Sequence, residues 1–124
     1  LLVHRVETVR DLDVQVVRVV EALGDESAIA ALAGELARES TAAGVAFADF
    51  YCTSGRFAAG LERAGFVAES SLATPFPGRF QPLALGSAPL TAALRLHAGD
   101  AGADPFAGEG VYFTRSDCDQ DRPS

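Results

Sequence analysis

The chain opens with two segments in which β-branched residues are frequent among polar ones. Residues 2–9 and 13–22 both show this pattern, which is typical of strands. Residues 10–13, Arg-Asp-Leu-Asp, can form a turn between them, so we expect an antiparallel hairpin. Alternation along the second strand divides its side chains between two faces, Val14, Val16, Arg18 and Val20 on one, and Gln15, Val17, Val19 and Glu21 on the other.

The next segments have the pattern of a crossover. Asp25 follows a glycine that interrupts the strand and is a good helix cap. Apolar residues then recur at helical spacing over 26–43, and Gly44 ends the pattern. Residues 46–52 are almost all apolar, as in a strand covered on both faces. Because strand–helix–strand units are right-handed crossovers, we expect this strand to lie parallel and adjacent to 14–22.

A second, shorter helix is predicted after the apolar strand. Thr53 and Ser54 can cap it, and Phe57 and Leu61 lie four residues apart on one of its faces. Gly65 can adopt the left-handed conformation that ends a helix.

The pattern beyond this helix is weaker. Residues 67–71 alternate as in a polar strand, and 75–82 form a proline-rich loop that contains Arg79. We further expect a strand at 90–97, a surface loop at 98–110 and a short final strand at 111–114. These elements predict one α/β domain over residues 1–114, a mixed sheet with a central parallel strand pair and two crossover helices, followed by an acidic polar tail at 115–124.

The order of elements over residues 14–72 resembles the second half of the GCN5-related N-acetyltransferase (GNAT) fold. In that family the fourth and fifth strands are parallel neighbours that splay apart and hold acyl-CoA. A helix that ends in Gly-Phe follows them, as it does here at Gly65 and Phe66. The resemblance implies an acyl-CoA-dependent N-acyltransferase that acts on a small substrate, with acetyl-CoA or another acyl-CoA as cofactor. The helices that begin the family's fold would precede Leu1, so we expect the domain to lack its amino-terminal part.

The resemblance also assigns cofactor-binding residues. The family's pyrophosphate loop follows its fourth strand and corresponds here to residues 21–28, which makes Gly24 and Ser27 the candidates. Two acidic residues come directly after Gly24, and Leu61 stands where the family often has the tyrosine that protonates the departing thiolate. These differences leave open an alternative, a non-catalytic GNAT-like domain that binds a ligand or completes a larger protein.

Asp49 is an acidic residue in the middle of the apolar strand. A buried carboxylate is costly unless it is paired, and Arg18 on the neighbouring strand is its obvious partner. The alternative makes Asp49 a general base and Tyr51, on the same face, a proton donor. Arg79 is a candidate for binding a substrate carboxylate or phosphate, and the alternative is a solvated loop arginine.

Charge and cysteine content narrow the classes of partner. The net charge of −7 and the isoelectric point near 4.6 argue against nucleic acid and against anionic membranes. Two scattered cysteines, Cys52 and Cys118, fit a reducing cytoplasm. No metal site is predicted, because no Cys/His cluster has zinc spacing and the aspartates of the tail lack the glycine of a calcium loop. A small-molecule substrate is the remaining class of partner.

Overall fold

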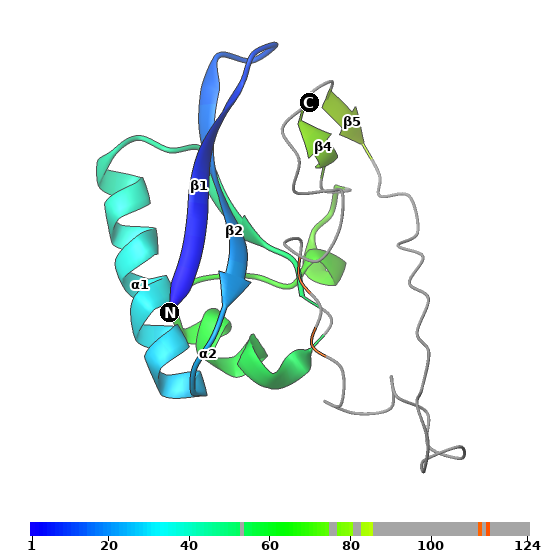
Figure 1. Ribbon diagram of the computed structural model, residues 1–124. Helices are drawn as coiled ribbons and strands as arrows, with labels where there is room; N and C mark the ends of the chain where they lie inside the picture. Colours follow the sequence, from blue (N-terminus) through cyan, green and yellow to red (C-terminus); the bar gives the residue numbers. More distant parts are fainter. Residues whose placement is uncertain (53, 75–76, 81–82, 86–111, 113, 115–124) are drawn as a thin grey trace, which may run out of the picture.

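A computed structural model describes residues 1–52, 54–74, 77–80, 83–85, 112 and 114. Its elements in chain order are β1 (Leu2–Val9), β2 (Val14–Ala22), α1 (Glu26–Ala42), β3 (Phe47–Phe50), the 3₁₀ turn η1 (Gly55–Phe57), α2 (Ala58–Arg63), the 3₁₀ turn η2 (Glu69–Ser71), β4 (Pro77–Phe80) and β5 (Leu83–Leu85). The described part of the chain is a small mixed α/β arrangement of a three-stranded sheet and two helices, with β4 and β5 as a separate pair (Figure 1).

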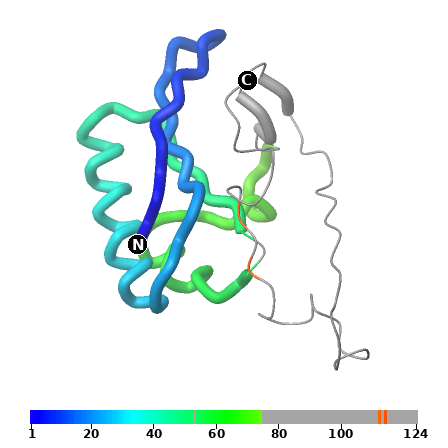
Figure 2. Tube along the Cα trace, viewed as in Figure 1, coloured from blue at the N-terminus to red at the C-terminus, as the bar shows by residue number. Residues whose placement is uncertain are grey.

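The three-stranded sheet has the order β1-β2-β3. β1 pairs antiparallel with β2 through a turn at residues 10–13, which confirms the predicted hairpin. β3 pairs parallel with β2, from Val16↔Phe47 to Val19↔Phe50, which confirms the predicted parallel neighbours. Figure 2 shows the hairpin turn at one end of the sheet and the start of α1 at the other. β2 continues to Ala22, beyond Val19, the last of its residues that pairs with β3.

An irregularity near the end of β2 changes the face that its residues occupy. The pairing with β1 passes from Val3↔Glu21 to His4↔Val19, so Val20 has no partner there and forms a bulge. A bulge adds one residue to one strand, and side chains beyond it point to the face opposite to the one that strict alternation assigns. The predicted alternation along β2 therefore ends at this residue.

The contacts of β2 follow this change. Val17 packs against Leu36 of α1, as the alternation predicts. Beyond the bulge, Ala22 packs against Ile29 of the same helix. The prediction that Glu21 shares the face of Val17 is therefore wrong, and Glu21 is turned away from α1 because the bulge separates the two positions.

α1 begins and ends where the sequence predicts, within one residue. The Asp25 side chain accepts a hydrogen bond from the Ala28 N–H at 2.8 Å and so caps the first turn. Gly44 has a φ of 71°, the left-handed conformation that lets the chain leave the helix and enter β3.

α2 packs closely against the first turns of α1. Ser54 caps η1 by accepting from the Arg56 N–H at 3.1 Å, and η1 runs directly into α2. Gly60 faces α1, and a Cβ atom placed there would lie 3.1 Å from the Ala30 Cβ. Gly65 ends the helix with a φ of 93°, as predicted.

Two predictions about the following residues are wrong. Residues 69–71 form η2 instead of a strand, because Ser71 turns back and donates both its N–H and its hydroxyl to the Ala68 carbonyl. Every side chain from 69 to 71 is exposed, so the polar alternation has no face to bury. The predicted loop at 75–82 contains β4, which pairs antiparallel with β5. Proline is compatible with this arrangement because, among the described residues, β4 has a strand partner on one edge only.

Several predictions concern residues outside the described part of the chain. They include the cap at Thr53, the strand at 90–97, the loop at 98–110 and the tail at 115–124. Of the predicted strand at 111–114, Tyr112 and Thr114 are described. No helix among the described residues is long and apolar enough to cross a membrane.

Candidate functional site

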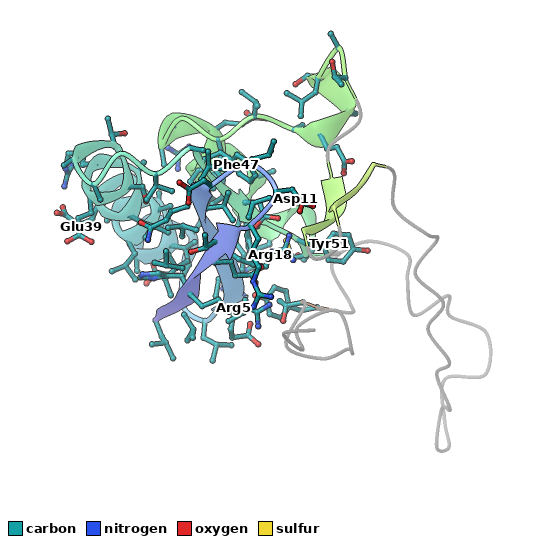
Figure 3. All side chains as sticks on the ribbon, turned by 90° about the horizontal axis from the view of Figure 1, so that it is seen from above. Arg5, Asp11, Arg18, Glu39, Phe47 and Tyr51 are labelled. Carbon is teal, nitrogen blue, oxygen red and sulfur yellow. The ribbon has the colours of Figure 1, made fainter. Side chains whose placement is uncertain are left out.

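Arg18 and Asp49 form the predicted ion pair in the middle of the sheet. They are register partners on β2 and β3, and the Arg18 Nη2 lies 3.3 Å from the Asp49 Oδ2. Their side chains are only 4% and 8% exposed. Arg5 of β1 is the register partner of Arg18 on the other side, so a polar row crosses all three strands. Figure 3 shows Arg5 and Arg18 side by side, with Tyr51 nearby.

On the face away from α1, an apolar cluster lies beside this row, toward the hairpin turn. Val9 and Val16 are almost fully buried there, and Phe47 packs against them. Arg5 makes its own ion pair with Glu7 at 2.6 Å along β1. The guanidinium groups are therefore matched by carboxylates within the sheet, as burial of charge requires.

A different polar cluster lies at the carboxyl end of β2. Just outside the paired strands, Leu1 before the start of β1 and Leu23 after the end of β2 exchange hydrogen bonds of 2.7 and 2.9 Å. Because successive residues of a strand direct their N–H and C=O groups to opposite edges, and those of Leu23 point to β1, the N–H and C=O of Ala22 point away from β1. They face the side on which β3 pairs with β2 four residues earlier, at Arg18.

The hydroxyl of Tyr112 occupies this position. It donates to the Ala22 carbonyl at 2.8 Å and accepts from the Ala22 N–H at 3.1 Å. The two residues are 90 positions apart in the chain. Burial, and after it the neighbouring Glu21 carboxylate, raises the pKa of Tyr112 well above that of a free phenol, so this hydroxyl keeps its proton.

Three further polar side chains gather beside Tyr112. Thr114 is fully buried, and its hydroxyl lies 3.3 Å from the Glu21 Oε2. Cys52 pairs with Thr114 in an antiparallel bridge, and its thiol donates to the Ser54 carbonyl at 3.3 Å. Burial raises the pKa of Cys52, and the charge of Glu21 adds to the increase, whereas the hydrogen bond to Ser54 opposes it.

An aromatic and cationic stack connects this cluster to the loop before α1. The rings of Tyr112 and Phe57 meet edge to face, with centroids 5.9 Å apart and planes at 88°. The Arg56 Cζ lies 5.3 Å from the centre of the Phe57 ring, and its Nη2 donates to the Gly24 carbonyl at 3.1 Å. The end of β2, the loop at Gly24 and the start of η1 therefore meet in one place.

The amino terminus of α1 is already occupied by the chain's own groups. The Asp25 Oδ1 accepts from the Ala28 N–H at 2.8 Å and from the Ser27 hydroxyl at 2.7 Å. These two hydrogen bonds lower the pKa of Asp25, so its carboxylate is charged at neutral pH. Glu26 is paired with Arg63 of α2 at 3.0 Å.

The two halves of an acyl-CoA fit these residues unequally. The N–H and C=O of Ala22 point to the same edge and can bond the C=O of one pantetheine amide and the N–H of the other, as they would bond a neighbouring strand. The terminus of α1 does not fit a pyrophosphate, since the Asp25 carboxylate takes the N–H of Ala28 and repels anions.

The structure brings some of the predicted site residues together and separates others. Gly24 and Ser27 share the loop and first turn of α1, at the end of β2. Asp49 lies in register with Arg18, four residues before Ala22, which is about 13 Å along a strand. The side chain of Arg79 lies outside the described part of the chain, and its backbone belongs to β4.

Sequence reasoning missed four residues of the cluster: Glu21, Cys52, Tyr112 and Thr114. A polar residue at the end of a buried strand, directly before a glycine loop, is a signal that could have identified Glu21. The positions of Tyr112 and Thr114 have no such signal.

Within the described ranges, no three His, Cys, Asp or Glu residues are grouped as a metal site would require. Comparisons of the chain with protein-family models, with curated proteins and with solved structures find no significant match.

Proposed function

We propose that this chain is a GNAT-like domain of an acyl-CoA-dependent N-acyltransferase acting on a small substrate. The observation that carries the proposal is the end of the parallel pair, where β2 continues past its last pair with β3 and Ala22 presents its N–H and C=O. In open α/β sheets, ligands bind outside the carboxyl ends of the strands. An extended ligand that contains amides can pair with this segment as a neighbouring strand does.

Glu21 is better placed than Asp49 to remove a proton from an amine substrate. Asp49 is buried and binds Arg18 through its carboxylate, so acting as a base would break that pair. Glu21 lies at the end of β2, one residue before Ala22, with a carboxylate oxygen near the Thr114 hydroxyl. A general base needs this proximity to the reacting group before its pKa matters. Acyl-CoA, when bound, supplies the activated thioester.

A second candidate, a non-catalytic GNAT-like domain that binds a ligand, is favoured by a specific observation. Asp25 fills the helix terminus that would otherwise hold the pyrophosphate. Leu61 packs with Phe57 in the apolar core, so no proton donor stands at the position that the family resemblance assigns to a tyrosine. Both observations predict weak binding of CoA and slow turnover.

Titration calorimetry with two probes tests binding, and an assay of acetyl transfer to an amine then separates the candidates. Acetyl-pantetheine carries the thioester and the amides, whereas acetyl-CoA adds the pyrophosphate and the nucleotide. We expect similar weak affinities for both, because the α1 terminus adds little. Asp25→Ser keeps a helix cap and should raise the affinity for acetyl-CoA alone. Glu39→Gln is the control, since it removes one exposed carboxylate at the other end of α1.

The outcomes assign the function. Acetyl transfer to an amine that falls at least 10²-fold in Glu21→Gln supports the enzyme with Glu21 as its base. Binding without transfer supports the non-catalytic domain. Failure of both probes to bind at millimolar concentration overturns the proposal.

A further inference from the structure

The Tyr112 hydroxyl takes, at Ala22, the two hydrogen-bonding positions that two successive amides of an extended ligand would take. It donates to the Ala22 carbonyl at 2.8 Å and accepts from the Ala22 N–H at 3.1 Å, whereas a ligand would use the N–H of one amide and the C=O of the next. Ala22 has one N–H and one C=O, so Tyr112 and such a ligand compete for the same two groups.

We propose that Tyr112 is a resident occupant of the ligand position, and that a ligand must displace its hydroxyl from Ala22 before it binds. Tyr112 thereby sets the apparent affinity of the site. The inference rests on the proposed function, because it concerns the same position at the end of β2.

The structure allows the hydroxyl to leave without loss of the fold. The Ala22 N–H also donates to the Glu21 Oε1 at 2.9 Å, so this group keeps a partner when the phenol departs. The bridge between Cys52 and Thr114 fixes the chain two residues beyond Tyr112. Displacement therefore exchanges hydrogen bonds at one side chain and leaves the sheet intact.

Competition of this kind lowers the apparent affinity by the fraction of molecules in which the position is open. A net hydrogen bond of ordinary strength corresponds to about a two- to tenfold change in an equilibrium constant. We expect Tyr112→Phe to bind acetyl-pantetheine about two- to tenfold more tightly than the wild type. Phenylalanine keeps a ring to meet Phe57 and removes only the hydroxyl.

Thr114→Val is the matched control. It removes the hydroxyl that faces Glu21 from a residue close to Tyr112 but leaves the Ala22 contacts in place. We expect its affinity for acetyl-pantetheine to stay within about twofold of the wild type. An increase equal to that of Tyr112→Phe would show that loosening around Thr114, and not loss of the phenol hydroxyl, changes the affinity, and would overturn the inference.

Fluorine NMR supplies a readout independent of affinity. The chain has two tyrosines, so labelling with 3-fluorotyrosine gives two resonances, and Tyr112→Phe identifies which belongs to Tyr112. Acetyl-pantetheine should shift the Tyr112 resonance as the hydroxyl leaves Ala22. Equal affinities of wild type and Tyr112→Phe, with an unmoved Tyr112 resonance, would overturn the inference and leave the proposed function standing. Absence of binding to both proteins would overturn the proposed function and this inference with it.

Discussion

The middle of the sheet and the carboxyl end of β2 satisfy their buried polar groups in different ways. Both bury polar groups next to the apolar core. In the middle, Arg18 and Asp49 face each other across paired strands, and the register of the sheet itself supplies each with its partner. The end of β2 has no partner residue on β3. There the N–H and C=O of Ala22 form hydrogen bonds with the hydroxyl of Tyr112, 90 positions away in the chain.

The difference separates a structural polar pair from a polar position that can be exchanged. Arg18 cannot lose Asp49 without leaving a charge in a site that water does not reach. Ala22 presents neutral groups, and we propose that an extended ligand takes the place of the phenol there. The middle of the sheet therefore contributes stability, whereas the end of β2 is the position that we propose for binding.

The strongest test of this comparison is Asp49→Asn. The amide cannot balance the buried Arg18 guanidinium, so we expect the free energy of unfolding to fall by about 3–5 kcal/mol in urea denaturation. Glu35→Gln makes the same chemical change in the exposed pair with Arg38 and should cost less than about 1 kcal/mol. If the two substitutions cost the same, Asp49 and Arg18 do not form a buried pair.

Gly60→Ala tests how tightly α2 packs against α1. The added methyl group would lie 3.1 Å from the Ala30 Cβ and 3.3 Å from the Glu26 carbonyl oxygen. Overpacking costs about 1–3 kcal/mol and the gain in helix propensity is about 1 kcal/mol. Because the Glu26 carbonyl cannot move aside, we expect a net loss of about 1 kcal/mol in the same denaturation experiment.

Gly34→Ala is the control for this substitution, because nothing lies within 4 Å of its added methyl group. It should stabilise α1 by up to about 1 kcal/mol. Equal gains at both glycines would mean that α2 does not pack against α1 as described.

The smallest expected effect is the response to alkaline pH. The pKa values of Tyr112 and Cys52 are both raised in the folded chain. Below the ordinary values, about 8.5 for a thiol and about 10 for a phenol, neither group changes the free energy of unfolding. Above them the unfolded chain releases its protons first, so stability falls as the pH rises.

We expect this alkaline decline to be shallower in Tyr112→Phe above pH 9.5 and in Cys52→Ser above pH 8. Urea denaturation between pH 7 and 10.5 measures both effects. A decline that neither substitution alters would show that these groups do not titrate differently on folding.

The elements that could be predicted from the sequence are those set by local pattern. Asp25 and Gly44 bound α1 through their own conformational preferences, and the crossover rule then placed β3 beside β2. The pairing of Arg18 with Asp49 followed from that placement, because a buried carboxylate needs a cation and only the adjacent strand could supply one.

The carboxyl end of β2 could not be predicted in the same way. The bulge at Val20 has no glycine or other local signal, yet it decides that Glu21 turns away from α1. The hydrogen-bond partner of Ala22 depends on tertiary structure, because no pattern in the sequence links a strand to a tyrosine 90 residues later. The part of the site that depends on contacts between distant segments is therefore seen only in the folded chain.

The distance between Tyr112 and Ala22 along the chain also orders events during synthesis. The hairpin, α1, β3 and α2 are all complete by residue 66, and their contacts are formed between segments close in sequence. At translation rates of about 5–20 residues per second, residue 112 follows roughly 2–9 s later. During that interval the Ala22 carbonyl lacks the Tyr112 hydroxyl, and the Ala22 N–H has only the Glu21 carboxylate as its partner among the described groups. Tyr112 therefore binds Ala22, at the end of β2, only after the sheet itself has been synthesised.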